Sequence, residues 1–259
     1  MKVLSSPTLN TNILVKLLVK LFLFLGFILS SACTTLDGPA NPDDPYESYN
    51  RSMYAFNEDA DKYVIKPIAE GYNYVMPDVA STGVTNFFNN IDDIVVFINE
   101  ILQFKMAEAV ETSARFVFNS TFGLFGLIDV STGWDLPKHN EDFGQTLAYW
   151  GVGSGNYLVL PLIGPSTVRD TAGLAVDWSA FDPVFNRQTL QQTLVTLSIK
   201  YIDKRAGLIS ASNIIDETVP DKYAFIRDAW LQRRQFLIYD GHPPDDEDFT
   251  EDELFDDDL

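Results

Sequence analysis

A helical alternation of apolar and polar residues covers the chain between residues 84 and 105, which reads VTNFFNNIDDIVVFINEILQFK. The apolar positions are Phe87, Ile91, Ile94, Val95, Ile98, Ile101 and Leu102. The other face carries Asn86, Asn89, Asn90, Asp93 and Glu100. This spacing predicts an amphipathic helix. The segment MAEAVETSARFVFNS predicts a second helix after a bend near Lys105.

Two further helices are predicted nearer the C-terminus. Between Thr189 and Tyr201, leucines recur along one stripe. Another helix is expected to start at Pro220, because proline is favoured in a first turn, and to stop at Asp240–Gly241. The segment YLVLPLI, residues 157–163, fits a short strand or an extended apolar loop, and no strong pair of alternating strands is evident. We therefore predict an all-α fold.

Two segments lack the pattern of an ordinary amphipathic helix. Residues 120–134 (STFGLFGLIDVSTGW) are apolar on all faces and dotted with glycine. Residues 156–168 (NYLVLPLIGPSTV) are apolar and cut by two prolines. A soluble domain can bury such pieces, or they can contact lipid. In the second case four aromatic side chains are expected at the membrane interface: Trp134, Tyr149, Trp150 and Tyr157.

The first 32 residues have the parts of a secretory signal. The only charges before Cys33 are three lysines, and an apolar run from Leu21 to Leu29 follows them. This run is too short to cross a bilayer, which needs about 20 residues, although a membrane anchor that includes the residues from Ile13 stays open. Cys33 is the only cysteine, so it brings no partner ligand for a metal site.

The end of this segment resembles a bacterial lipoprotein signal, in which the cysteine is lipidated and becomes the new N-terminus. Leu29 stands four residues before Cys33 rather than three, and Ser30 takes the usual leucine place. Thr34 follows the cysteine, not the aspartate associated with retention in the inner membrane. The resemblance implies cleavage before Cys33, a lipid anchor on Cys33, and a location on the periplasmic side of the outer membrane.

Composition and charge divide residues 33–259 into a flexible tether, a folded domain and an acidic tail. Residues 33–259 carry 15 basic and 37 acidic residues, which excludes a typical nucleic-acid binder because phosphates need clustered Lys and Arg. Residues 243–259 contain ten acids and no bases, and we expect a disordered acidic tail. The sequence TTLDGPANPDD predicts a flexible tether over 33–44, which leaves one helical domain at 45–242.

The chain offers little for catalysis. GVGSG at 151–155 resembles a phosphate loop only superficially, because no Lys-Ser/Thr follows it. His242 lies at the edge of the tail, so His139 is the remaining imidazole, and we expect it to be a solvated loop residue. Glu141 and Asp142 are adjacent, which tends to point them apart and makes a weak acid–base pair. We predict no enzymatic activity, no cofactor and no metal site.

Five segments carry long and specific motifs. They are DPYESYNRSMYAFNEDAD at 44–61, NFFNN at 86–90, RFVFNSTFGLFGLIDV at 115–130, EDFGQTLAYWGVGSGNYLVLPLIGPSTVRD at 141–170 and YAFIRDAWLQRRQFLIYDG at 223–241. In this order they resemble the MlaA family, also called VacJ lipoproteins, over nearly all of 44–241, with 206–219 less typical. The resemblance implies a ring-shaped, helical, membrane-associated lipoprotein with a central amphipathic channel.

The resemblance also implies a function and partners. Lipoproteins of this family associate with trimeric porins and remove phospholipids that are mislocalised in the outer leaflet of the outer membrane. The lipids pass through the channel to a soluble periplasmic lipid carrier, and outer-membrane lipid asymmetry is thereby maintained. A phospholipid-acting enzyme and a passive porin-associated scaffold are the alternatives.

The family-motif positions are the candidate channel or gate residues. They are Asn50, Arg51, Phe56, Asn57, Asp142, Phe143, Gly144, Gln145, Gly153, Pro161, Gly164, Pro165, Arg169 and Asp170. For NRSMYAFN at 50–57, structural capping and packing competes with gating. The Gly- and Pro-containing turns at 151–165 can form a movable apolar gate or a fixed turn, and we expect Arg169 and Asp170 to pair beyond them.

Overall fold

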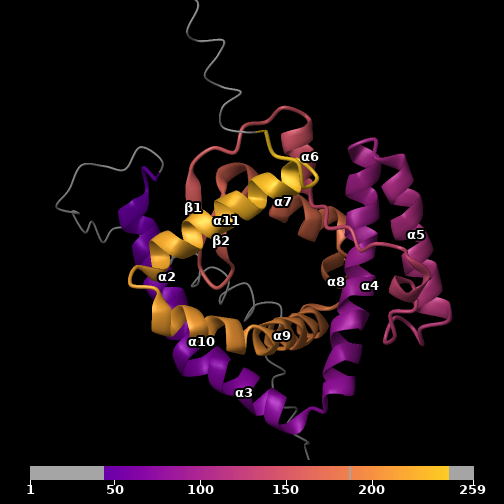
Figure 1. Ribbon diagram of the computed structural model, residues 1–259, viewed down its shortest axis with the longest axis horizontal. Helices are drawn as coiled ribbons and strands as arrows, with labels where there is room; N and C mark the ends of the chain where they lie inside the picture. Colours follow the sequence, from indigo (N-terminus) through magenta and orange to yellow (C-terminus); the bar gives the residue numbers. More distant parts are fainter. Residues whose placement is uncertain (1–43, 187, 245–259) are drawn as a thin grey trace, which may run out of the picture.

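A computed structural model describes residues 44–186 and 188–244, and this part of the chain is mostly helical, as predicted (Figure 1). The α-helices are α2 (Glu47–Ala60), α3 (Lys66–Val75), α4 (Asp78–Leu102), α5 (Met106–Thr121), α6 (Phe143–Tyr149), α7 (Val168–Val176), α8 (Pro183–Asn186), α9 (Leu190–Gly207), α10 (Ile209–Thr218) and α11 (Lys222–Ile238). Short π-helices η1 (Asp61–Ile65) and η3 (Asp177–Phe181) and the 3-10 helix η2 (Thr132–Trp134) join them. The strands are β1 (Tyr157–Leu160) and β2 (Gly164–Thr167).

The helices α4 and α5 confirm the two amphipathic patterns read from the sequence, and they pack side by side (Figure 1). The first helix starts earlier than the pattern indicated, at Asp78, because Pro77 sets an extended residue directly before it. The bend near Lys105 is confirmed. Phe104 has a φ of +61° there, and α5 begins at Met106.

The segment that fitted a strand or an extended loop forms one arm of a β-hairpin. Strands β1 and β2 are antiparallel, with Tyr157 opposite Thr167 and Leu160 opposite Gly164. Leu162 and Gly164 have φ values of +62° and +98°, which close the turn. The hairpin packs against α2 and α11 through a small core of Tyr157, Val159 and Tyr223, with Met53, Tyr54, Trp230 and Leu231 around it.

The two predicted C-terminal helices are present, with one corrected boundary. Thr189 caps α9 through a capping box with Gln192, which satisfies free N–H groups of the first turn. The prediction that Pro220 starts the last helix was wrong: Asp221 is the N-cap, since its carboxylate accepts from Ala224 N at 3.2 Å, and α11 begins after it. The helix ends at Ile238 with Tyr239 as its C-cap, and the predicted stop at Asp240–Gly241 is confirmed by the positive φ values of these two residues, +50° and +87°.

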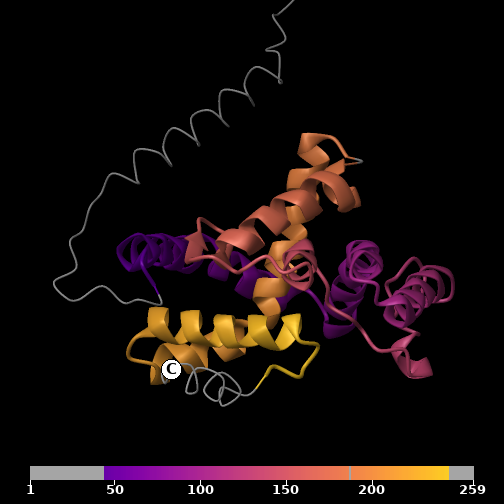
Figure 2. The same cartoon turned by 90° about the horizontal axis from the view of Figure 1, so that it is seen from above.

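The elements pack in a closed circuit of contacts. In order, α2 contacts β1, β1 pairs with β2, β2 contacts α11, α11 contacts α6, α6 contacts α4, α4 contacts α9, α9 contacts α3, and η1 joins α3 back to α2 (Figure 1). Helix α5 lies outside this circuit on α4. Figure 2 shows α11 along one side of the molecule and the orange segment that contains α7 and α8 rising on the opposite side.

The interior of the described part of the chain is polar and much of its surface is apolar. Buried polar and charged residues outnumber buried hydrophobic ones, and the largest fully buried side chains include Glu100, Asn50 and Asn99. Large hydrophobic side chains remain exposed instead, for example Tyr74 at 91% and Phe125 at 81%. Among the described helices, none combines the length and the hydropathy that a membrane crossing requires.

Candidate functional site

The motif asparagines of α2 hold the β-hairpin by its backbone. Asn50 is fully buried. Its Nδ2 donates to Tyr157 O at 3.0 Å and to Asp44 Oδ1 at 2.8 Å, and its Oδ1 accepts from Val159 N at 2.9 Å. Asn57, two helical turns later, donates to Leu160 O at 2.9 Å and accepts from Leu162 N at 2.6 Å. Spacing of seven residues places both amides on one face of α2, along one strand and its turn.

The other two motif residues of α2 face outward or toward α11. Arg51 binds Asp221 with two hydrogen bonds of 3.1 and 2.8 Å, and its guanidinium lies 4.4 Å from the centre of the Tyr223 ring. This stacked, bidentate arrangement suits arginine and not lysine. Phe56 is 42% exposed. The contacts of Asn50, Arg51 and Asn57 therefore support the packing interpretation of the NRSMYAFN motif. Gating by this motif stays a prediction.

The motif acids Asp142 and Asp170 meet around an arginine that the sequence analysis did not single out. Arg234 of α11 binds Asp142 with hydrogen bonds of 2.6 and 2.7 Å and Asp170 with 3.1 and 2.9 Å. Arg169 Nε adds a 3.0 Å bond to Asp170 Oδ1, so the predicted pair is confirmed. Burial alone would raise the pKa of Asp142, but the Arg234 guanidinium holds it below its usual value.

The glycines at the α6–α7 contact make this cluster sterically feasible. A Cβ on Gly144 would lie 2.5 Å from both Arg234 Nη2 and Asp170 Oδ1. A Cβ on Gly173 would lie 2.4 Å from Gly144 N and 2.7 Å from Gly144 Cα. All four distances are far below van der Waals contact. The motif glycine therefore allows α6 to touch α7 directly, above the buried ion pairs.

The rest of the EDFGQ motif starts α6 and ties it to α4. Asp142 is the N-cap and accepts from Gln145 N at 3.0 Å, while Phe143 N donates to Asp177 Oδ2 at 2.9 Å. Asn99 of α4 donates to Asp177 Oδ1 at 3.0 Å. Burial raises the pKa of Asp177 to about 6, although these hydrogen bonds oppose the change.

The remaining motif positions lie on the hairpin and the loop before it. Gly153 is exposed, and a Cβ there would meet nothing within 4 Å. Pro165 stands opposite Val159 in the hairpin, and Pro161 and Gly164 flank its turn. Leu162 and Ile163 at the tip are 42% and 47% exposed. The turn is thus an apolar projection held by Asn57.

Aromatic residues expected at a membrane interface divide into two groups. Trp134, Tyr149 and Trp150 are 53%, 55% and 50% exposed, which agrees with that expectation. Tyr157 is 3% exposed and belongs to the core, so the expectation was wrong for it. The glycine-dotted segment after α5 is strongly exposed, with Phe122, Leu124 and Phe125 between 60% and 81%.

Glu100 and His139 are two further groups with unusual surroundings. Glu100 is fully buried in α4, and burial raises its pKa to about 7 while a 2.8 Å hydrogen bond from Thr112 opposes the change. His139 is not the solvated loop residue that we expected: its side chain is 21% exposed, and Nε2 lies 2.9 Å from Glu111 Oε2. No sequence motif joins these residues. The predicted lipid anchor at Cys33 and the tail from 245 lie outside the described residues.

Comparison with known proteins agrees with the family resemblance inferred from the sequence motifs. The model of the MlaA lipoprotein family matches residues 42–237. The intermembrane phospholipid transport system lipoprotein MlaA of Haemophilus influenzae is 34% identical over 202 residues, which are 77% of this chain and 80% of that protein. Its namesake in Escherichia coli is 33% identical over 203 residues, 76% of this chain and 79% of that protein. An uncharacterised protein of Rickettsia bellii is 34% identical over 205 residues, 79% of this chain and 80% of that protein.

A solved structure is similar to this chain in fold. It comes from work on the "Structural basis for maintenance of bacterial outer membrane lipid asymmetry" and superposes with a TM-score of 0.67 at 29% identity. The match covers 75% of this chain and 98% of that one. The chain belongs to the MlaA lipoprotein family.

Proposed function

We propose that this protein removes phospholipids mislocalised in the outer leaflet of the outer membrane and passes them to a soluble periplasmic lipid carrier. In this way it maintains outer-membrane lipid asymmetry by retrograde transport. Family membership supports the substrate class, because relatives carry the name of a phospholipid transport system. The observation that carries the proposal is the polar interior beneath an apolar surface, within a closed circuit of helices and one hairpin.

That distribution of polarity suits a conduit for an amphiphile. A lipid headgroup needs polar surroundings as it moves, whereas the outside of the conduit must sit in hydrocarbon. Helices satisfy their own backbone hydrogen bonds, so their outer faces can be apolar without a desolvation cost. We propose that the circuit encloses a central amphipathic channel and that the exposed apolar faces of α3 and α5 lie in the lipid near the inner leaflet.

The β-hairpin is our candidate for the gate. Its base is fixed by buried Asn50, whereas its exposed apolar tip depends on the two hydrogen bonds of Asn57. Replacing Asn57 by alanine removes both bonds and leaves the base intact. A matched control is Asn86→Ala, which removes one exposed asparagine-to-backbone bond, to Leu127 O at 3.2 Å, far from the hairpin.

The location and partners complete the proposal. Lipidation of Cys33 would anchor the chain on the periplasmic side of the outer membrane. Trimeric porins would hold it there, and the periplasmic carrier would receive the lipid.

The test is the amount of phospholipid accessible at the surface of cells with and without the gene, probed by a phospholipase added outside. We expect more surface phospholipid without the gene and restoration by the wild-type chain. Asn57→Ala should change the surface level while Asn86→Ala matches the wild type at equal protein levels. Equal surface phospholipid with and without the gene would favour the scaffold alternative. Lysophospholipid or free fatty acid produced by the purified protein would favour an enzyme.

A further inference from the structure

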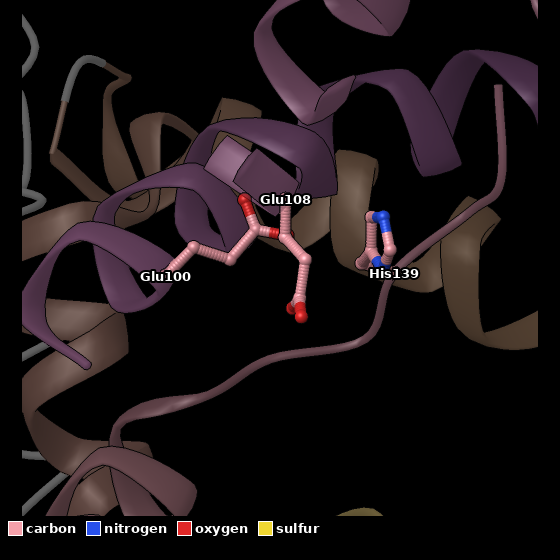
Figure 3. A group of neighbouring side chains, drawn as sticks. All are labelled: Glu100, Glu108 and His139. Atoms are coloured by element: carbon pink, nitrogen blue, oxygen red, sulfur yellow. The ribbon is translucent and has the colours of Figure 1, made fainter. Parts of the chain in front are cut away.

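A cluster of metal-ligating side chains lies apart from the motif positions, where the end of α4 and the start of α5 meet the loop before α6. Glu100, Glu108 and His139 each offer one ligand atom, and these atoms all lie within 4.8 Å of one another. Figure 3 shows the two glutamates reaching from the helices and the His139 ring facing them from the loop. The three residues come from three separate elements, so a shared ligand would tie these elements together.

Glu100 supplies the observation that points to a ligand. Its side chain is 0% exposed. Oε1 accepts a hydrogen bond from Thr112 Oγ1 at 2.8 Å, whereas Oε2 has no hydrogen-bond partner among the described residues. A buried carboxylate oxygen without a partner is costly, and folded proteins compensate it with a partner group or a metal ion. The ligand atoms of Glu108 and His139 lie beside this carboxylate.

His139 contacts a carboxylate outside the cluster of three. Its Nε2 lies 2.9 Å from Glu111 Oε2. A histidine that binds a metal commonly donates its other ring N–H to a carboxylate, which fixes the tautomer and makes the ligating nitrogen more basic. The contact with Glu111 leaves Nδ1 as the nitrogen available to a metal.

We propose that Glu100, Glu108 and His139 bind one divalent transition-metal ion of the Zn²⁺ or Mn²⁺ type. One imidazole with two carboxylates suits these ions, whereas Mg²⁺ and Ca²⁺ prefer oxygen ligands alone. Around an ion with bonds of about 2.0 to 2.2 Å, neighbouring ligand atoms lie roughly 3 to 4 Å apart. Small rotations of the half-buried Glu108 and His139 close the difference. The same partial exposure provides an entry path for the ion.

The charge around the cluster agrees with a bound cation. Lys105 binds Glu141 at 3.0 Å and also contacts Asp240, and both of these carboxylates lie within 4.8 Å of that of Glu108. Among the described residues, no lysine or arginine forms an ion pair with Glu100, Glu108 or Glu111, and Glu111 contacts His139. A dication would neutralise two of these charges and fasten the α4–α5 turn to the loop that leads to Asp142.

The experiment is a Zn²⁺ titration of the full chain, purified in detergent without a polyhistidine tag and stripped of metal with a chelator. The titration buffer contains physiological salt and excess Mg²⁺, which occupy weak cation sites on the acidic surface. We expect one tightly bound Zn²⁺ per chain by calorimetry and elemental analysis. Zn²⁺ at about 100 times its dissociation constant should raise the thermal midpoint by roughly 5 to 10 °C.

Substitutions distinguish Zn²⁺ binding at this site from nonspecific binding to the acidic surface. Glu100→Gln keeps an oxygen for the Thr112 hydrogen bond and should fold, but it should weaken Zn²⁺ binding at least about tenfold. His139→Gln should have the same effect. Glu111→Gln should weaken Zn²⁺ binding by about tenfold, because Glu111 orients His139. The control Glu70→Gln makes the same charge change on the exposed face of α3 and should leave binding unchanged. Zn²⁺ binding that is absent, or equal in Glu100→Gln, His139→Gln and Glu70→Gln, would overturn the proposal.

Discussion

Gly173→Ala tests whether the direct contact of α6 with α7 supports the ion pairs beneath it. The added Cβ would stand 2.4 Å from Gly144 N, and its other nearest atoms are also backbone. A flexible side chain could rotate away, but a helix backbone cannot. The two helices must therefore separate by about 1 Å to reach ordinary contact, which exceeds the range over which Arg234 hydrogen bonds to both Asp142 and Asp170 survive.

The expected magnitude combines three contributions. Alanine in place of glycine in a helix gains up to about 1 kcal/mol. Overpacking costs about 1 to 3 kcal/mol, and a clash with backbone belongs at the upper end. Weakening a buried ion pair adds to that cost, up to about 3 to 5 kcal/mol when one partner is lost completely. We expect a net loss of about 2 to 4 kcal/mol in the free energy of unfolding, which is a fall of roughly 5 to 15 °C in the thermal midpoint.

The control is Gly71→Ala in α3, where an added Cβ meets nothing within 4 Å. It makes the same chemical change in a helix, so it should raise the midpoint by roughly 2 to 4 °C. Circular dichroism in detergent at one heating rate compares the two variants with the wild type. A Gly173→Ala protein as stable as Gly71→Ala would refute the reasoning, because the close helix contact could not then be present.

Three further predictions address the ion pairs, the pH dependence and the anchor. Arg234→Met should lower the free energy of unfolding by about 3 to 5 kcal/mol, because it leaves Asp142 without its arginine and removes one of the two arginines that bind Asp170; a loss no larger than the gain from Gly71→Ala in the same melts would contradict this. Burial raises the pKa of Asp177 from 3.8 to about 6, with Asp142 and Arg234 as the facing charges, so the folded state binds this proton more tightly than the unfolded chain. Asp177 should therefore contribute up to about 3 kcal/mol of added stability as the pH falls from about 7 to 4, and melts of Asp177→Asn should show a pH-dependent rise that is smaller than that of the wild type by this amount. Cys33→Ser should be missing from the outer membrane on fractionation, and a normal level there would argue against lipidation.

The helices could be predicted from the sequence where one face is clearly apolar. The stripe along α4, the bend before α5 and the Thr189 cap depend on neighbours within a few residues, so local chemistry determines them. The start of α11 was misplaced because two N-terminal signals are adjacent there. Pro220 is compatible with a first turn, but the Asp221 carboxylate accepts hydrogen bonds from the free N–H groups and Asp221 is the N-cap.

The polar clusters could not be predicted, because their members are distant in sequence. The chain offers Arg233 and Arg234 side by side, and nothing local says which one is buried. The choice depends on how α11 rotates to meet Asp142 and Asp170, which are 92 and 64 residues away. The family motif identified both acids but not their common partner.

Matched polar pairs in the interior also indicate where motion can occur. Removing one partner of a buried pair costs more than the intact pair contributes, so such pairs strongly oppose any movement that separates them. Asn50 fixes the base of the hairpin in this way, and Arg234 fixes α6, α7 and α11. The hairpin tip is different, because its apolar side chains are exposed and, within the described part of the chain, the hydrogen bonds that join its backbone to α2 are those of Asn57. Displacing the tip breaks two partly exposed hydrogen bonds, whereas displacing the base of the hairpin or the contact of α6 with α7 breaks buried ones. A gate in this protein is therefore expected at the tip, with the rest of the motif serving as its rigid frame.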